Sequence, residues 1–180
     1  MIFFIYAPKS DNESSLKKDC LRKQMLTLLP FSFPGRIFRS PMPFSTYDKS
    51  IAWESYLEQD VNLVVILTEQ QEYRVYALRD LPKFYRSNGL DVLHIPVPDF
   101  GVPPDSIKWE EGIYAVIDAA EEGKNVVVHC LAGRGRTGMF LACIAKANLG
   151  LSGDQAISWV RESIPGALEN YDQEEYVINY

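Results

Sequence analysis

The chain has 180 residues and a net charge of −6, with 47% hydrophobic and 12% aromatic residues. This composition is ordinary for a globular protein that buries one core. The acidic balance argues against a general nucleic-acid-binding protein, which would carry a basic stripe. No apolar run approaches the roughly 20 residues of a membrane span, so we expect no stable membrane insertion.

The first 34 residues are predicted to form an extension that either packs on the domain or is flexible. Its apolar beginning stops at Pro8 and has neither a basic leader nor a convincing cleavage site, so we expect no signal peptide. Residues 8–20 are polar and are either mobile or a surface helix.

From residue 35 onward, short apolar runs alternate with segments of helical periodicity. Strands are predicted over residues 35–40, 62–68, 91–97 and 125–130. Helices are predicted over residues 47–60, 104–123, 137–147, 154–163 and 172–180, with one or two helical turns over 69–88 that break near Pro82. Strands that alternate with helices indicate a mostly parallel sheet covered on both faces. We therefore predict a single α/β domain over residues 35–180, with a central sheet of four to five strands.

Two of these helices have apolar positions that predict which side faces the core. In the segment 47–60 the predicted inward residues are Ile51, Trp53 and Leu57. In the segment 104–123 they are Ile107, Ile113, Val116 and Ile117.

The three cysteines are Cys20, Cys130 and Cys143. They include no close pair and no metal-ligand spacing, so we expect a reduced, cytoplasmic setting and no metal site. Cys143 lies in an apolar helical run and is expected to pack in the core.

The most informative segment is His-Cys-Leu-Ala-Gly-Arg-Gly-Arg-Thr-Gly at positions 129–138. It places Cys130 six positions before Arg136, between a predicted buried strand and a predicted helix. A tight turn of this kind directs backbone N–H groups and the positive helix end toward one point, which makes an anion site. The same field favours the thiolate, and Arg136 offers a planar, two-pronged donor to phosphate oxygens. A thiolate in a phosphate cradle predicts nucleophilic attack on phosphorus. The alternative is a buried structural cysteine beside a solvated arginine.

The pattern His-Cys-x-x-Gly-x-x-Arg-Thr-Gly resembles the signature loop of the cysteine-dependent phosphatases. Residues 35–180 resemble the compact, atypical dual-specificity members, which typically begin like Gly-Arg-Ile-Phe-Arg-Ser-Pro-Met-Pro at 35–43. The resemblance implies a phosphotyrosine phosphatase-like fold and a metal-independent phosphomonoester hydrolase that needs no cofactor. Large tyrosine-specific members carry Trp-Pro-Asp where this chain has Val-Pro-Asp, and we recognise no tyrosine loop. The predicted pocket is therefore shallow and open to phosphoserine and phosphothreonine as well as phosphotyrosine in proteins.

The resemblance also implies roles for individual residues. Cys130 is the expected nucleophile, and the expected phosphate-binding residues are Leu131, Ala132, Gly133, Arg134, Gly135 and Arg136. The general acid is assigned to Asp99, in a loop rich in proline and glycine, unless this residue merely closes a turn. Asp105 is its competitor but is better placed as a helix cap.

Three further residues have expected supporting roles. Thr137 is expected to donate a hydrogen bond to the sulfur of Cys130, to cap the following helix, or both. His129 is expected to orient the loop through its ring nitrogens, from the opposite face of the strand. Gln173 either positions the hydrolytic water or is an ordinary surface glutamine.

The substrate class stays open from the sequence. Arg134 is either a solvated residue or a contact for further phosphates, as in the lipid phosphatases of this superfamily. Besides a phosphoprotein phosphatase, the chain could be a phosphoinositide, phospholipid or RNA 5′-triphosphate phosphatase with the same cysteine loop. A catalytically silent phosphate-binding module is the third alternative. The oligomeric state does not follow from the sequence.

Overall fold

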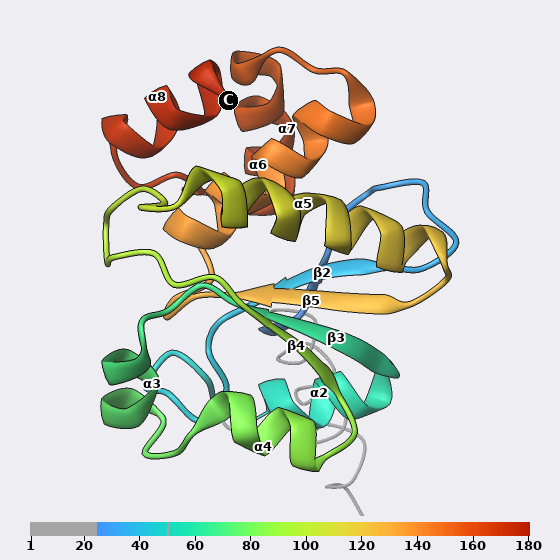
Figure 1. Cartoon of the computed structure of the whole chain (residues 1–180), viewed down its shortest axis with the longest axis vertical. Helices are drawn as coiled ribbons and strands as arrows, with labels where there is room; N and C mark the ends of the chain where they lie inside the picture. Colours follow the sequence, from blue (N-terminus) through green and yellow to red (C-terminus); the bar gives the residue numbers. More distant parts are fainter. Residues whose placement is uncertain (1–24, 50) are drawn as a thin grey trace, which may run out of the picture.

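The computed structural model describes residues 25–49 and 51–180, and its centre is one five-stranded sheet (Figure 1). The strands are β1 (Thr27–Leu28), β2 (Ile37–Ser40), β3 (Val61–Ile66), β4 (Asp91–His94) and β5 (Asn125–His129), in the spatial order β1-β2-β5-β3-β4. β1 pairs with β2 in the antiparallel direction, and the other pairs are parallel. The predicted mostly parallel sheet of an α/β domain is confirmed. The division at residue 34 stays a prediction, and residues 8–20 with Cys20 lie outside the described part of the chain.

Helices cover both faces of this sheet (Figure 1). One face carries α2 (Ala52–Glu58), α3 (Gln70–Tyr76) and α4 (Leu81–Ser87). The other carries α5 (Ser106–Glu121), α6 (Gly135–Leu149), α7 (Gly153–Ser163) and α8 (Tyr171–Asn179). Of the helices that the structure describes, none has the length and apolar character needed to cross a membrane.

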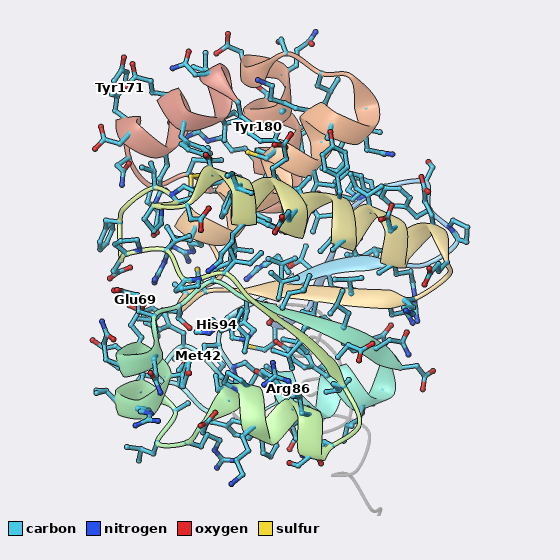
Figure 2. The ribbon with its side chains drawn as sticks, viewed as in Figure 1. Met42, Glu69, Arg86, His94, Tyr171 and Tyr180 are labelled. Carbon is cyan, nitrogen blue, oxygen red and sulfur yellow. The ribbon has the colours of Figure 1, made fainter. Side chains whose placement is uncertain are left out.

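The sheet separates the interior into two cores, one on each face, and side chains fill both (Figure 2). Successive side chains of β5 point alternately into the two cores. Val126 and Val128 face the larger core, where Trp109 packs edge-to-face on Phe140. Val127 faces the smaller core. Since β5 lies between two parallel neighbours, its carboxyl end is held at the middle of the sheet.

The predicted helix over residues 47–60 is shorter than expected, and its inward face is different. It begins at Ala52, and its buried residues are Ala52, Ser55 and Tyr56. Leu57, predicted to be inward, is 55% exposed. Ile51 is only partly buried, whereas Trp53 is partly buried and packs against the smaller core, as predicted. The buried positions 52, 55 and 56 follow the spacing of one helix face, so Leu57, one residue after Tyr56, points about 100° away from it.

Two smaller predictions also need correction. Ile107 is 69% exposed, because six helical positions place it about 120° away from Ile113 around the helix axis. Pro82 does not break the helical segment but lies in the first turn of α4. A proline is tolerated there because an N–H group in the first turn has no acceptor within the helix. The break comes earlier, around Leu78, whose φ is 54°.

Cys143 lies on α6 in the larger core, as predicted. Its burial raises the pKa of the thiol to about 12, so it stays protonated at neutral pH.

Candidate active site

The loop after β5 has the strand–loop–helix geometry that the motif predicts. β5 ends at His129, Cys130 follows, and α6 begins at Gly135. Cys130 is 3% exposed, and its Sγ accepts a hydrogen bond from the backbone N–H of Gly133 at 3.3 Å. The backbone of this loop therefore already directs one N–H group at the sulfur.

Gly133 is needed for this loop to form. Its φ is +73°, and a Cβ atom there would lie 2.3 Å from the carbonyl oxygen of Ser40. The loop thus packs directly on the end of β2, and only a residue without a side chain fits at this position.

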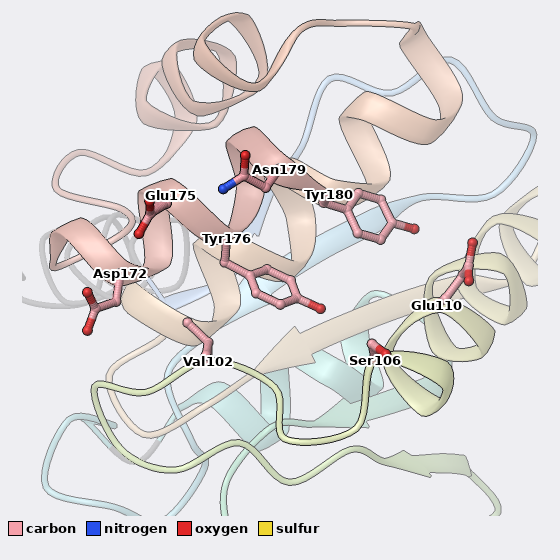
Figure 3. Close-up of a pocket in the computed structure, with 8 residues that line it drawn as sticks. All are labelled: Val102, Ser106, Glu110, Asp172, Glu175, Tyr176, Asn179 and Tyr180. Carbon is pink, nitrogen blue, oxygen red and sulfur yellow. The ribbon is translucent and has the colours of Figure 1, made fainter.

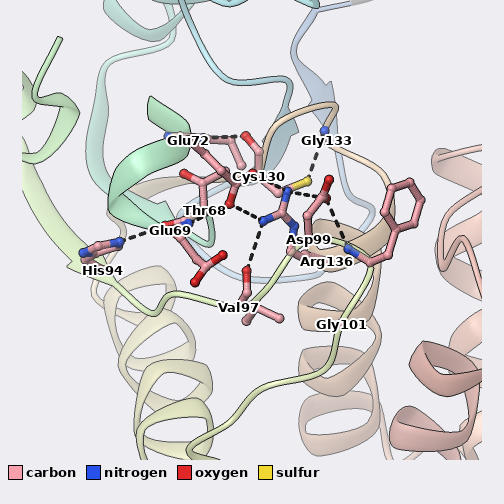
Figure 4. Close-up of polar contacts among 12 residues, drawn as sticks. Thr68, Glu69, Glu72, His94, Val97, Asp99, Gly101, Cys130, Gly133 and Arg136 are labelled. Carbon is pink, nitrogen blue, oxygen red and sulfur yellow. Dashed lines mark hydrogen bonds and ion pairs between the residues drawn. The ribbon is translucent and has the colours of Figure 1, made fainter. Parts of the chain in front are cut away.

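Arg136 lies beneath the loop and is almost completely buried. Its guanidinium donates to both carboxylate oxygens of Glu72, at 2.7 and 2.9 Å (Figure 4). It also donates to the carbonyl of Val97 at 3.0 Å and to Asp99 Oδ1 at 2.8 Å. Burial opposes the charge, but the hydrogen bond with Glu72 and the neighbouring anions outweigh it, so that the pKa of Arg136 is raised. The side chain is a fixed cation held beside the loop that contains Cys130.

Asp99 joins this site from the loop after β4. Its side chain is 54% exposed, with one oxygen on Arg136 and the carboxylate within reach of solvent. The next residue, Phe100, has a φ of +56°, a left-handed conformation that is uncommon for a bulky side chain. Asp105, the competing candidate, instead caps α5 by accepting a hydrogen bond from the N–H of Lys108.

These residues surround a pocket of about 70 Å³. Of the predicted site residues, its lining includes Cys130, Leu131, Ala132, Arg136, Asp99 and Gln173. Three residues that the sequence analysis did not select complete the lining: Tyr47, Phe100 and Glu169. Arg134 is exposed and lies outside this lining.

His129 is completely buried behind the loop. Its Nδ1 lies 3.0 Å from the carbonyl oxygen of Cys130, and its Nε2 lies 3.2 Å from the hydroxyl of Tyr85. Since a carbonyl can only accept, Nδ1 carries the proton and Nε2 accepts from Tyr85. Burial lowers the pKa of His129 to about 4, so the ring is neutral at physiological pH. A neutral ring in this position fits the predicted orienting role.

Two supporting residues differ from their simplest predictions. The hydroxyl of Thr137 is buried and has no hydrogen-bond partner among the described residues, so the predicted bond to Cys130 is not formed in this state. Gln173 is completely buried and is not a surface glutamine. Its Oε1 accepts from the N–H of Glu169 at 2.9 Å, and its Nε2 donates to the carbonyl of Gly101 at 3.4 Å.

The most important residue that the sequence analysis missed is Glu72. A buried arginine is stable only with an anionic partner, and in the structure Glu72 is that partner for Arg136. It lies in the polar run at residues 69–72, which contains two glutamates and reads as an exposed helix start. Only the packing of α3 beside the loop identifies the right one. Within the described residues, no cluster of histidine, cysteine and carboxylate side chains could hold a metal ion.

Comparison with known proteins identifies the family. Residues 44–148 match the family model described as "Polymorphic toxin system, DSP-PTPase phosphatase", and because this is more than half of the chain, the protein belongs to that family. The predicted relationship to the dual-specificity phosphatases is thereby confirmed.

A similar protein is the tyrosine-protein phosphatase cdc-14 of Caenorhabditis elegans, 27% identical over 151 residues, which are 84% of this chain and 20% of that protein. Among curated relatives the matched share of the relative's own length runs from 12% to 60%. The crystal structure of Tk-PTP in its active form is 32% identical, with a TM-score of 0.66 over 81% of this chain and 90% of that one. Kinase associated phosphatase shares the fold, with a TM-score of 0.76 at 19% identity over 84% and 90% of the two chains.

Proposed function

We propose that this protein is a metal-independent phosphomonoester hydrolase that removes phosphate from phosphotyrosine, and from phosphoserine and phosphothreonine, in proteins. The observation that carries the proposal is the meeting of Cys130, Arg136 and Asp99 around one pocket of about 70 Å³. A nucleophile, a phosphate clamp and an acid are the groups that transfer of a phosphoryl group through cysteine requires.

In the first step the thiolate of Cys130 attacks phosphorus, so that an S–P bond forms and the P–O bond to the leaving group breaks. Arg136 and the backbone N–H groups from residue 131 to residue 136 hold the other phosphate oxygens through the transition state. Asp99 gives its proton to the departing oxygen, which leaves as an alcohol or phenol.

In the second step water attacks the cysteinyl phosphate. The S–P bond breaks, its electron pair returns to Cys130, Asp99 takes the proton from water, and inorganic phosphate leaves. Gln173 lines the pocket and can orient the water, and the unpartnered hydroxyl of Thr137 is available to the departing thiolate after a rotation about its χ1 angle.

The rim of the pocket supports a phosphoprotein substrate. Tyr47 and Phe100 line the pocket and are 54% and 60% exposed. An aromatic ring entering with its phosphate can pack on these side chains, while a shallow pocket also admits shorter phosphorylated side chains. A reactive thiolate needs a reducing environment, so we place the protein in the cytoplasm.

The second candidate function is hydrolysis of phosphoinositides, other phospholipids or RNA 5′-triphosphate by the same residues. It is supported by Arg39 and Arg134, two arginines whose side chains form no hydrogen bond or ion pair with the residues that the structure describes. Arg39 Nε is buried without a partner, and burial and the charge of Arg134 both lower the pKa of Arg39. Such a pair would suit a second phosphate on the substrate. A silent phosphate-binding module is less well supported, because nucleophile, clamp and acid are all present.

The test is phosphate release, in excess chelator, from matched phosphotyrosine and phosphothreonine peptides beside a soluble phosphoinositide, with Cys130→Ser as the blank. Turnover of the peptides supports the protein phosphatase. Turnover of the phosphoinositide alone transfers the proposal to the lipid class, and binding without turnover of any substrate supports the silent module.

A further inference from the structure

A groove of about 650 Å³ lies between the beginning of α5 and the helix α8 (Figure 3). Its lining consists of Val102, Ser106, Glu110, Asp172, Glu175, Tyr176, Asn179 and Tyr180. The groove is separate from the catalytic pocket, and none of these residues takes part in the proposed reaction.

The charged side chains of this groove are all acidic. Three carboxylates, Glu110, Asp172 and Glu175, lie on its lining, and the lining contains no lysine, arginine or histidine. None of the three forms an ion pair with any residue that the structure describes. The unpaired acidic groups create a local negative potential, in addition to the negative charge of the whole chain.

Aromatic side chains line the groove between these carboxylates. The rings of Tyr176 and Tyr180 extend from α8 toward α5 and Glu110 (Figure 3). Tyr176 packs edge-to-face on the buried Trp109, which fixes its orientation. Burial, together with neighbouring groups that include Glu110, raises the pKa of Tyr176 to about 12, so the ring stays neutral. Neutral aromatic faces beside unpaired carboxylates are the complement of a lysine or arginine side chain.

The groove is joined to the catalytic pocket by a short strip of backbone. Val102 belongs to the same loop as Asp99, and two hydrogen bonds tie this loop to the start of α8. Asn170 donates to the carbonyl of Phe100 at 2.7 Å, and Gln173 donates to that of Gly101 at 3.4 Å. Phe100 and Gln173 themselves line the catalytic pocket. A peptide whose phosphorylated residue enters the pocket can therefore continue along this strip into the groove.

We propose that this groove binds a lysine- or arginine-bearing segment of the phosphoprotein substrate, on one side of the phosphorylated residue. The inference rests on the proposed protein phosphatase function and adds a preference for basic substrates. An anionic segment would be repelled by the three carboxylates, and a purely apolar one would leave them desolvated without a partner. A basic segment satisfies both the charges and the rings.

The first experiment compares phosphopeptides that are identical except for one arginine, which is moved position by position along either side of the phosphorylated residue and replaced by alanine in the reference. We expect at least one position to raise kcat/KM by about threefold or more, mainly through KM, because the contact lies outside the reacting atoms. The gain should disappear in about 0.5 M salt. Equal kcat/KM at all positions overturns the inference.

The variant Glu110→Gln combined with Glu175→Gln removes two charges from the groove and keeps the side-chain shape. It should abolish the preference for arginine and leave turnover of p-nitrophenyl phosphate unchanged. Glu121→Gln is the matched control, because this exposed residue lies on the same helix α5 but outside the groove. An arginine preference that survives in the double variant overturns the inference.

A binding measurement separates this inference from the proposed function. A fluorescent, unphosphorylated arginine peptide is titrated with the wild-type chain and with the double variant, and its anisotropy is followed. If no phosphopeptide is turned over but the labelled peptide binds the wild type more tightly than the variant, the phosphatase proposal fails and the basic docking groove stands. Equal affinity for both proteins overturns the groove, whatever the activity.

Discussion

Arg136 and Glu72 form a buried, two-pronged ion pair, with donor–acceptor distances of 2.7 and 2.9 Å. Together with the contacts to Val97 and Asp99, this pair occupies both terminal nitrogens of the guanidinium, and Nε has no hydrogen-bond partner among the described residues. A phosphate that binds in the two-pronged mode needs Nε and one terminal nitrogen. In the proposed mechanism, a phosphate that binds in this mode therefore displaces Asp99 from Arg136, and the freed carboxyl group can turn toward the leaving group.

Replacing Glu72 should damage both stability and phosphate binding. In Glu72→Gln the buried Arg136 loses its buried charged partner and keeps only the half-exposed Asp99, which should cost up to about 3–5 kcal/mol of unfolding free energy. Denaturant unfolding measures the loss, and isothermal titration with phosphate measures the weakened binding. Glu122→Gln is the control, because its ion pair with Lys124 is exposed and should leave both quantities unchanged. Wild-type phosphate affinity in Glu72→Gln would show that the pair does not position Arg136.

Replacing Asp99 should separate chemistry from binding. Asp99→Asn removes the proton donor and the anion that competes with phosphate for Arg136, so we expect phosphate to bind at least as tightly as in the wild type. We expect kcat/KM, which reports the first step, to fall by roughly 10²–10³ for an alkyl phosphate and by much less for p-nitrophenyl phosphate, whose leaving group needs no proton. Steady-state kinetics on both substrates test this. Equal losses on the two substrates would contradict the acid role, and Asp105→Asn should retain full activity.

Replacing Gly133 should disrupt the catalytic loop by steric contact. In Gly133→Ala the new Cβ would lie 2.3 Å from Ser40 O, so the loop must move and phosphate affinity should fall at least about tenfold, since oxyanion donors lose their geometry. Gly150→Ala is a matched control, because its φ is also positive, at +66°, but no atom lies within 4 Å of the added Cβ. That control should lose about 1 kcal/mol of stability and bind phosphate normally. Similar phosphate affinities in both variants would exclude the steric explanation.

His129 should make the stability depend on pH. Its folded-state pKa of about 4 lies below the ordinary value of 6.5, so the unfolded chain binds a proton that the folded protein excludes. The stability that this difference contributes is complete above pH 6.5 and is lost as the pH falls toward 4, and by pH 4 the loss amounts to about 3 kcal/mol. Denaturant unfolding at several pH values tests this prediction. The decline over this range should be shallower in His129→Gln, and identical slopes would contradict the assignment.

Features that one continuous segment of the chain forms could be predicted from the sequence better than features that distant segments form together. The loop from Cys130 to Arg136 is one continuous segment, so its spacing was sufficient to predict its geometry. The strands β2 to β5 were also predicted, because apolar runs of Val, Ile and Leu mark them directly, whereas the two-residue strand β1 was missed. Helix faces were predicted less well, and Leu57 and Ile107 are exposed despite their apolar character.

Residues that reach the site from distant segments could not be selected from the sequence. Glu72, Tyr47 and Glu169 have neighbours that read as ordinary polar surface, and only tertiary packing brings them to the pocket. The burial of Gln173 could not be predicted either, since its neighbours in the sequence are polar and yet its side chain is completely buried. Asp99 could be selected from the sequence, because it lies in a proline-rich loop that directly follows a predicted core strand.

The measurement that tests the account most directly is a rapid-quench experiment on the wild-type chain with a phosphotyrosine peptide in excess chelator, followed by mass spectrometry of the digested protein. We expect one phosphoryl group on the peptide that contains Cys130, formed before steady-state phosphate release and missing in Cys130→Ser, which should bind phosphate without turnover. Phosphate release by Cys130→Ser at a rate near that of the wild type would contradict the account, because the thiolate would then not be the nucleophile.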